Sequence, residues 1–324
     1  REARVMAELR RQAHAPRDAR DDPPWGAAWR TADFLEDPAA GLRAAAMMTE
    51  PFRSPRGRLV GYTTRAHLEM ARGRWRAARA ALDTAATLDA GYAARTRAFL
   101  FAFAPVAVPA GEVARARRAL LATAPPRPDG VGDVVDHEKG AFPAARHAYL
   151  LGALAVALGD TAEVRRRVDE LGAPADTGAA AAVFARHLRH QLRARQLRAE
   201  RRYPEALREV ERGWPEPVAA VFVKNDSYST VAERYLRAEL LAHTGRDAEA
   251  LRWYGSLAED ISRGLLFPTA AHLPRGRALE RLGRPAQAAA EYRRFLVLFA
   301  GADAEAGPSL ADARARLGRL PAAR

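Results

Sequence analysis

The sequence lacks several features that would place it in familiar classes of protein. Its 324 residues include no cysteine, which excludes a disulfide framework and a zinc site built on thiolates. No apolar run approaches the roughly 18 to 20 residues that a helix needs to cross a bilayer. The most apolar stretch, 98–110, is interrupted by Pro105 and Pro109. We find no signal peptide and expect a cytoplasmic protein that does not insert into membranes. The chain begins with arginine rather than methionine, as a piece of a longer polypeptide would.

The motifs of common enzyme classes are also missing from the sequence. There is no Gly-x-Ser-x-Gly nucleophile elbow, and Gly130-Val131-Gly132 lacks the remaining glycine and the preceding strand of a phosphate-binding loop. Asp136-His137-Glu138, followed by His147, is the densest group of potential metal ligands. Its spacing fits no zinc motif, so we interpret it as a loop that caps the next helix.

His187 and His190 form a second possible metal site, because residues three apart share one face of a helix. Arg186, Arg189 and Arg193 surround them, and their positive field opposes the binding of a cation. We interpret this segment as a solvated basic face. From these observations we predict a protein that is not an enzyme, with no catalytic residue, no metal and no cofactor.

The charge of the chain is strongly positive. The formal net charge is +13, and only Lys139 and Lys224 among the 52 basic residues are lysines. A basic balance of this size suggests nucleic acid or an acidic surface as a partner. An arginine-rich, lysine-poor composition is also typical of a high-GC bacterial genome, in which case the charge is a solvated surface. Both interpretations stay open at the level of sequence.

A short phrase recurs along the chain: a glycine, a polar residue, often an aromatic, and then an alanine-rich stretch. It begins at Gly73, Gly111, Gly159, Arg201, Gly245 and Gly283, at intervals of 38, 48, 42, 44 and 38 residues. At Arg201 an arginine stands in place of the glycine. Glycine accepts the left-handed conformation that ends a helix, so each phrase predicts a helix stop followed by a helix start. Apolar residues at three- and four-residue steps flank the phrases, which indicates helices on both sides. The short apolar run 219–223 is the one candidate for a strand.

The phrases and their flanks resemble tetratricopeptide repeats. That pattern places a small residue seven positions before the inter-helix glycine, another five positions after it, and a large side chain four positions further on. The corresponding triplets are Ala66, Ala78 and Leu82; Gly152, Val164 and Val168; Ala194, Ala206 and Val210; Ala238, Ala250 and Tyr254; and Gly276, Ala288 and Tyr292. In the second triplet the small residue after the glycine is lost, because Val164 occupies that position. Around Gly111, Ala116 and Leu120 fit, but Pro105 and Pro109 disrupt the expected first helix. Small residues would let paired helices approach closely.

The resemblance implies an all-α fold, an α-solenoid of about six degenerate helix-turn-helix units over residues 58–324 that ends in a capping helix. Residues 1–57 would form an N-terminal helical extension and linker, with helices at 1–13, near 26–36 and near 38–49, and a break at 51–57. Residues 124–142, rich in proline, glycine and aspartate, are expected to form a long loop. The segment 289–320 is similar to the C-terminal repeat region of bacterial multidomain regulators, where such repeats follow a kinase, a cyclase or a DNA-binding module.

In the resembled family, the first helix of each unit lines a concave face that binds peptides. Carrying those positions over gives a candidate peptide-binding set of Arg146, Tyr149, Gln191, Arg195, Arg198, Tyr235, Glu239, His243 and Arg277. Arg195, Glu239 and Arg277 stand where chaperone-binding members have an asparagine that clamps a carboxylate, which argues against that activity.

The function implied by the resemblance is a protein-interaction scaffold in a bacterial signal-transduction or assembly system. Because the guanidinium fork of arginine binds carboxylates in bidentate fashion, we expect an acidic peptide or protein segment as the partner. A nucleic-acid-binding helical repeat is the alternative, and a solvated surface without a ligand is the other interpretation of the same arginines. The sequence does not indicate an oligomeric state.

Overall fold

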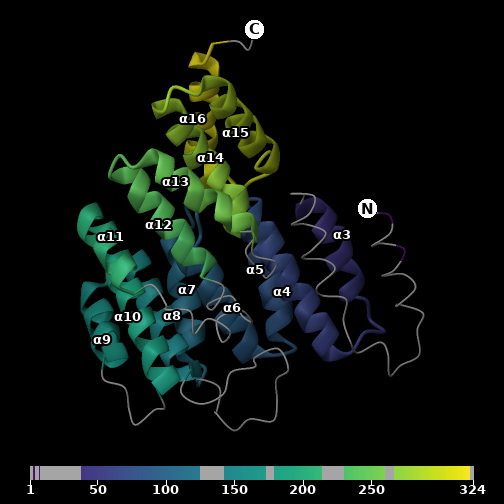
Figure 1. The fold of residues 1–324 in the computed structure, drawn as a ribbon. Helices are drawn as coiled ribbons and strands as arrows, with labels where there is room; N and C mark the ends of the chain where they lie inside the picture. The colour runs from purple at the N-terminus through teal and green to yellow at the C-terminus, as the bar shows by residue number, and fades with distance from the viewer. Residues whose placement is uncertain are drawn as a thin grey trace.

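The protein is helical throughout the part of the chain that the structure describes (Figure 1). The computed structural model describes residues 38–124, 142–172, 179–213, 230–259 and 266–321, and the isolated positions 3 and 7. Within these ranges there are fourteen α-helices, two short 3-10 helices and no strand. The predicted all-α repeat architecture is therefore confirmed.

Twelve of the described helices form six consecutive pairs, which we number as units 1 to 6. The units are α4 (Pro55–Ala71) with α5 (Trp75–Ala86), α6 (Ala90–Ala102) with α7 (Ala110–Leu121), α8 (Phe142–Leu158) with α9 (Thr161–Gly172), α10 (Ala179–Ala199) with α11 (Tyr203–Arg212), α12 (Val231–His243) with α13 (Asp247–Gly255), and α14 (Leu266–Arg281) with α15 (Pro285–Leu298). Before them lies α3 (Pro38–Met48), and after them lie η3 (Ala304–Ala306) and α16 (Gly307–Arg319). A further 3-10 helix, η2 (Ser256–Glu259), follows α13. The number of pairs agrees with the predicted number of units.

Four of the predicted inter-helix glycines adopt the left-handed conformation. Gly73, Gly159, Gly245 and Gly283 have φ angles between 68° and 78°, a region that glycine enters without steric cost. In unit 4 the same position is held by Arg201, which has φ 61°. The turn geometry is therefore common to five units, and in one of them a residue with a side chain must adopt it.

The prediction for Gly111 is wrong. Gly111 is the second residue of α7 rather than the end of a helix, and its φ is not positive. The link between α6 and α7 is instead 103–109, where Pro105 and Pro109 exclude a helix. These prolines do not disrupt the first helix of unit 2, because α6 ends at Ala102, before both of them.

The residues of the predicted small-and-large triplets are all buried. A methyl group on Gly276 would lie 2.4 Å from Cε1 of Tyr292, so this glycine lets α14 and α15 approach as expected. A methyl group on Gly152 would lie 2.5 Å from Cδ2 of Leu192. Because Leu192 belongs to α10, Gly152 also serves the contact between units 3 and 4.

The first unit begins slightly earlier than predicted. The helix expected near 38–49 is present as α3, but the predicted break at 51–57 is shorter, because α4 already starts at Pro55. Ser54 caps this helix, since its Oγ accepts a hydrogen bond from the backbone N–H of Gly57 at 3.0 Å, and proline is well suited to the first turn. Ala45 of α3 packs with Leu68 and Ala71 of α4, so α3 continues the stack.

Arginine side chains join most of the successive units through carboxylates. The pairs are Arg79–Glu112 at 3.0 Å between units 1 and 2, Arg117–Asp160 at 2.9 Å between units 2 and 3, Arg198–Glu239 at 2.9 Å between units 4 and 5, and Arg281–Asp247 at 2.8 Å between units 5 and 6. Between units 3 and 4, Arg195 donates instead to the Tyr149 hydroxyl at 3.1 Å. Part of the arginine excess therefore holds the stack together.

The last unit returns to the first, a contact that the sequence did not lead us to expect. In Figure 1, α14 to α16 stand above α4 and α5, and α14 contacts α4. The backbone N–H of Asp303 donates to the carbonyl of Gly73 at 3.0 Å, and Val106 shares an apolar cluster with Leu273 of α14. Each first helix contacts the first helix of the next unit, so α4, α6, α8, α10, α12 and α14 form a closed ring.

Several predictions fall outside the described residues. They are the helices expected at 1–13 and 26–36, the loop over 125–141 with Asp136, His137 and Glu138, and the candidate strand at 219–223.

Candidate functional site

The nine predicted peptide-binding residues all lie on the first helices of units 3 to 6, as expected from their positions in the repeat. Arg146 and Tyr149 belong to α8, Gln191, Arg195 and Arg198 to α10, Tyr235, Glu239 and His243 to α12, and Arg277 to α14. Packing between neighbouring units divides them into a buried group of four, an accessible group of four and the half-buried Arg195, which the sequence did not distinguish.

Four members of the set are buried, with exposed fractions of 4% for Arg146, 1% for Tyr149, 0% for Gln191 and 8% for Tyr235. Burial raises the pKa values of Tyr149 and Tyr235, so both phenols stay protonated at neutral pH. A peptide on the surface does not reach these side chains in the described conformation. Their inclusion in the set followed helix positions, whereas their burial depends on how the neighbouring units pack.

A hydrogen-bonded network connects part of this buried group. The Tyr149 hydroxyl accepts a hydrogen bond from Arg195 at 3.1 Å and donates one to Glu233 at 3.2 Å. The guanidinium of Arg195 lies 4.2 Å from the centre of the Phe103 ring, a cation–π distance. Arg195 is therefore engaged in the interior, and Glu233 is a member of this network that the sequence did not single out.

Gln191 is the least satisfied polar side chain of the set. It is fully buried, and within the described ranges neither its amide oxygen nor its amide nitrogen has a hydrogen-bond partner. An unpaired buried polar group costs roughly 1–3 kcal/mol. Gln191 therefore weakens the interior of unit 4 instead of contributing to an accessible surface.

The accessible group, which we call the inner-face cluster, consists of Arg198, Glu239, His243 and Arg277. The Arg198 side chain is 44% exposed and that of Arg277 is 39% exposed. Arg198 donates to Glu239 at 2.9 Å, and Arg277 donates to Asp312 of α16 at 2.7 Å. Both arginines thus remain in contact with solvent while each already binds one carboxylate.

His243 completes the inner-face cluster by stacking on Tyr203 of α11. The two ring centres lie 4.2 Å apart with an angle of 6° between the planes. Burial lowers the pKa of His243, and nearby arginines lower it further, so the imidazole is neutral at physiological pH. The positive charge of the cluster therefore comes from its arginines.

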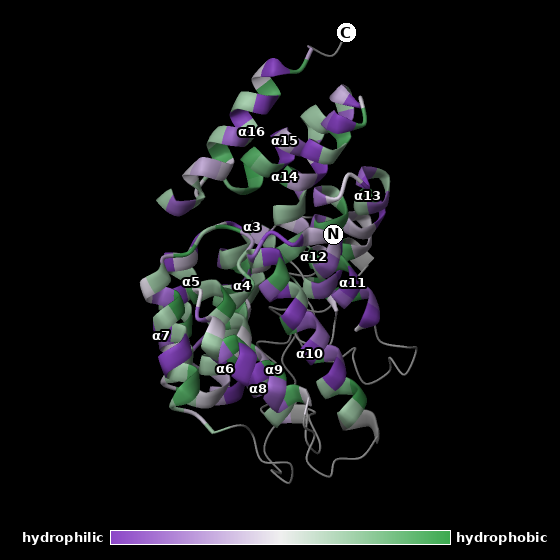
Figure 2. Ribbon diagram, turned by 90° about the vertical axis from the view of Figure 1, so that its left-hand side faces the viewer, coloured by the Kyte–Doolittle hydropathy of each residue, from purple (hydrophilic) through white to green (hydrophobic). Residues whose placement is uncertain are grey.

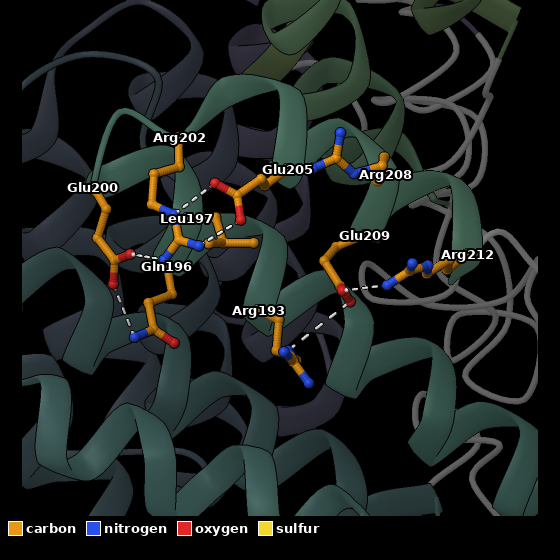
Figure 3. Close-up of a pocket in the computed structure, with 9 residues that line it drawn as sticks. All are labelled: Arg193, Gln196, Leu197, Glu200, Arg202, Glu205, Arg208, Glu209 and Arg212. Carbon is orange, nitrogen blue, oxygen red and sulfur yellow. Dashed lines mark hydrogen bonds and ion pairs between the residues drawn. The ribbon is translucent and has the colours of Figure 1, made fainter.

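A second polar site is the cleft between α10 and α11, with a volume of about 390 Å³ (Figure 3). Its lining is Arg193, Gln196, Leu197, Glu200, Arg202, Glu205, Arg208, Glu209 and Arg212. Figure 2 shows the hydrophilic character of α10 and α11 in this region. Of the arginines at 186, 189 and 193, which we interpreted only as a solvated face, Arg193 lines this cleft.

Ion pairs neutralise much of the charge in the cleft. Arg202 donates to Glu205 at 2.8 Å and to Glu200 at 3.2 Å. Glu209 lies 2.8 Å from Nδ1 of His190 and accepts a hydrogen bond from Arg212 at 3.2 Å. Burial acts to raise the pKa of Glu209, but the contact with His190 and the arginines nearby outweigh it, so the pKa is lowered.

Two arginines of the cleft are held loosely. Arg193 approaches Glu209 only to 4.0 Å, and Arg208 is exposed with no hydrogen bond or ion pair among the described residues. Arg208 is therefore unpaired within the described residues, and Arg193 is held only by one long ion pair.

The two histidines of α10 do not face a common point. His187 is buried, with its Nδ1 2.5 Å from the carbonyl oxygen of Gly213, whereas His190 contacts Glu209. The prediction of a solvated face is thus wrong for His187, because the end of α11 folds back over it. Burial lowers the pKa of His147, so the imidazole of His147 is neutral at physiological pH. Over the described ranges, no group of three or more His, Asp or Glu side chains could hold a metal ion.

None of the helices in the described ranges is long and apolar enough to cross a membrane. A scan against protein-family models gave no match for this sequence, and a search of curated proteins gave none either.

Proposed function

We propose that the chain is a non-catalytic scaffold that binds an acidic protein segment through its inner face. The observation that carries this proposal is that Arg198 and Arg277 are half-exposed and each already binds a carboxylate, Glu239 and Asp312 respectively. Carboxylates are therefore the groups for which these positions are suited. A partner's aspartate or glutamate would replace Glu239 or Asp312 with the same hydrogen-bond geometry.

We propose further that the units are degenerate tetratricopeptide-like repeats of a bacterial signalling or assembly protein. Four left-handed inter-helix glycines and the burial of the small-and-large triplets support this assignment. The assignment identifies a type of scaffold but no partner, because one repeat architecture serves many functions.

The scaffold proposal is tested by reversing charge on the inner face. A fluorescein-labelled decapeptide rich in aspartate and glutamate is titrated with the wild-type chain and with the Arg198→Glu/Arg277→Glu variant. We expect at least a tenfold weaker affinity for the variant. Because both substitutions also remove the ion pairs to Glu239 and Asp312, circular dichroism and thermal melting of the variant check that its helices and the attachment of α16 are retained. Arg195 is left intact because its substitution would break the interior contact with Tyr149.

The matched control is Arg252→Glu/Arg293→Glu, which changes the net charge equally at two exposed arginines of the outer helices α13 and α15. The control variant should bind the decapeptide almost as well as the wild type. Equal losses in both variants would mean that the peptide responds to overall charge and not to the inner face.

A second candidate function is binding of nucleic-acid phosphates, favoured by the loosely held Arg193 and Arg208 in the cleft between α10 and α11. It predicts binding of a labelled single-stranded oligonucleotide that weakens steeply with salt, because phosphate contacts release counterions. The Arg193→Ala/Arg208→Ala variant should show a shallower salt dependence. Absence of binding at about 50 mM salt would exclude this function.

A further inference from the structure

The contact that closes the ring joins a basic notch to an acidic segment. We define the α5 notch as Gly73, Trp75 and Arg76, at the start of α5, and the acidic segment as Asp303-Ala304-Glu305, directly before α16. Trp75 and Glu305 are separated by 230 positions in the sequence. The two parts meet only because unit 6 folds back onto unit 1.

The acidic segment supplies the cap that α5 lacks. Arg74 occupies the N-cap position of α5 and makes no side-chain cap hydrogen bond, so the first backbone N–H groups of the helix need another acceptor. Asp303 provides it, since its Oδ2 accepts from the backbone N–H of Arg76 at 2.9 Å. A carboxylate is favoured at this end of a helix by the partial positive charge there.

The remaining contacts recognise two carboxylates at a fixed spacing. The guanidinium of Arg76 donates to Asp303 at 3.0 Å and to Glu305 at 3.0 Å. The indole N–H of Trp75 donates to the other oxygen of Glu305 at 2.9 Å, and this bond lowers the pKa of that carboxyl. The Gly73 carbonyl accepts the backbone N–H of Asp303 at 3.0 Å. The notch therefore forms hydrogen bonds with both the backbone and the side chains of an Asp-x-Glu sequence.

The arginine of the notch is accessible from solvent, whereas Gly73 and Trp75 are buried in the closed ring. The Arg76 side chain is 52% exposed, whereas Asp303 and Glu305 are 18% and 25% exposed. Exposed ion pairs are weak because water competes for both partners. A segment with the same spacing of carboxylates could therefore exchange with the chain's own segment once the ring opens.

We propose that the α5 notch is a docking site for an Asp-x-Glu segment of a partner protein, and that residues 303–305 block it in the closed ring. The inference extends the proposed scaffold function by adding a second acidic-segment site with its own regulation. An intramolecular segment has an effective concentration of millimolar order, so a peptide at micromolar concentration does not displace it from the wild-type chain.

The test uses a fluorescein-labelled peptide with the sequence of residues 299–308 and measures its anisotropy with full-length chains. Asp303→Asn/Glu305→Gln weakens the internal segment while keeping its size. We expect this variant to bind the peptide at least tenfold more tightly than the wild type. Adding Arg76→Glu should remove the gain, and a peptide with asparagine and glutamine at the two acidic positions should not bind.

Equal binding of the peptide to the wild type and to Asp303→Asn/Glu305→Gln, including no binding to either, would overturn the proposal. So would a gain that survives Arg76→Glu. If the double variant does not fold, Glu305→Gln alone keeps the proposal testable, because it leaves the contacts of Asp303 in place and should give a smaller gain in the same direction. Introducing Arg198→Glu/Arg277→Glu into the double variant should leave this peptide bound, which separates failure here from failure of the inner-face proposal.

Discussion

Arg201 shows how the repeat constrains single residues. Its position is equivalent to that of Gly73, Gly159, Gly245 and Gly283, and its φ of 61° lies in the same left-handed region. A residue with a Cβ atom pays about 1–2 kcal/mol to adopt this conformation. The turn between α10 and α11 is therefore strained by the residue at its centre.

We predict that Arg201→Gly stabilises the chain by about 1 kcal/mol, because glycine adopts a positive φ without that steric cost, although it loses more entropy on folding. Urea denaturation followed by circular dichroism measures the change in the free energy of unfolding. The converse substitution, Gly159→Ala, should destabilise by a similar amount, since nothing lies within 4 Å of the added methyl group and only strain is introduced. Loss of stability in Arg201→Gly would contradict this explanation.

Gly276 tests the close approach of helices that the repeat pattern predicts. We expect Gly276→Ala to destabilise by about 1–3 kcal/mol, the usual cost of overpacking a core, because the methyl group would lie 2.4 Å from the Tyr292 ring. Gly255→Ala, also in a helix but with no atom within 4 Å, is the control and should keep or slightly raise stability, because alanine has the higher helix propensity. Similar melting temperatures for the two variants would mean that α14 and α15 do not pack as described.

The residue-scale predictions from sequence succeeded where the governing interaction is local. The left-handed glycines and the buried triplets follow from the turn and from helical spacing, and both were predicted. Gly111 was mistaken for a helix stop because prolines six and two positions earlier had already ended the preceding helix. His187 was mistaken for a solvated residue because its contact with Gly213 depends on how α11 returns to α10.

At the scale of elements, α16 is attached to α14 through carboxylates that must stay charged. Asp312 accepts hydrogen bonds from Arg277 at 2.7 Å and from Arg316 at 2.9 Å, and Glu280 accepts one from Arg316 at 2.8 Å. Burial acts to raise the pKa values of Asp312 and Glu280, but both values are lowered, at Asp312 by the hydrogen bonds from Arg277 and Arg316 and at Glu280 by those from Tyr292 and Arg316.

Because the pKa values of both carboxyl groups are lower in the folded state, the free energy of unfolding must decrease as the pH falls. The contribution of Asp312 and Glu280 to stability is complete above their unfolded pKa values, near 4, and is lost as the pH falls through the lower folded values. We therefore predict that the free energy of unfolding falls below about pH 4.5. In Asp312→Asn this acid dependence should be smaller, and chemical denaturation at several pH values measures it. An identical pH slope in the variant would show that Asp312 is not ionically bound to α14.

The helices themselves were largely predictable, whereas their ionic partners were not. The helix ends at Gly73, Gly159, Gly245 and Gly283 and the helix near 38–49 were predicted from the sequence, and the resemblance implied the capping helix that is present as α16. Which arginine pairs with which carboxylate depends on the rotation between successive units, and the repeat phrases carry no information about that rotation. For the same reason, the sequence did not separate buried Tyr149 from exposed Arg198.

At the scale of the whole molecule, the ring depends on a close contact at Gly73. A methyl group there would lie 2.8 Å from Cδ1 of Phe299 and 2.9 Å from Cβ of Ala302, whereas nothing lies within 4 Å at Gly245. Both glycines have positive φ, so alanine introduces the same backbone strain at each. Comparing alanine substitutions at Gly73 and Gly245 therefore isolates the contribution of ring closure to stability.

We predict that Gly73→Ala destabilises the chain by about 1–3 kcal/mol more than Gly245→Ala, because only the former also overpacks the contact between units 1 and 6. Differential scanning calorimetry of both variants measures the difference. Equal destabilisation would mean that unit 6 does not rest on unit 1.

Closure of the ring could not have been predicted from the repeats. Each unit specifies only its contacts with its neighbours. The sum of the small rotations between successive units therefore decides whether unit 6 meets unit 1. The residues that form the closure, Trp75, Arg76, Asp303 and Glu305, carry no pattern that links them across 230 positions. Trp75 is buried in the repeat core, and its indole N–H has this additional role.

The most direct test of this account is a distance between unit 1 and the segment that follows unit 6. The absence of cysteine allows nitroxide labels to be placed only at Ala80→Cys on α5 and Gly301→Cys before the acidic segment, both exposed positions. Double electron–electron resonance should give one narrow, short distance distribution in the otherwise wild-type chain and a broader, longer one when Asp303→Asn/Glu305→Gln is added. A broad, long distribution in the chain with its acidic segment intact would show that the ring is open and would contradict the account.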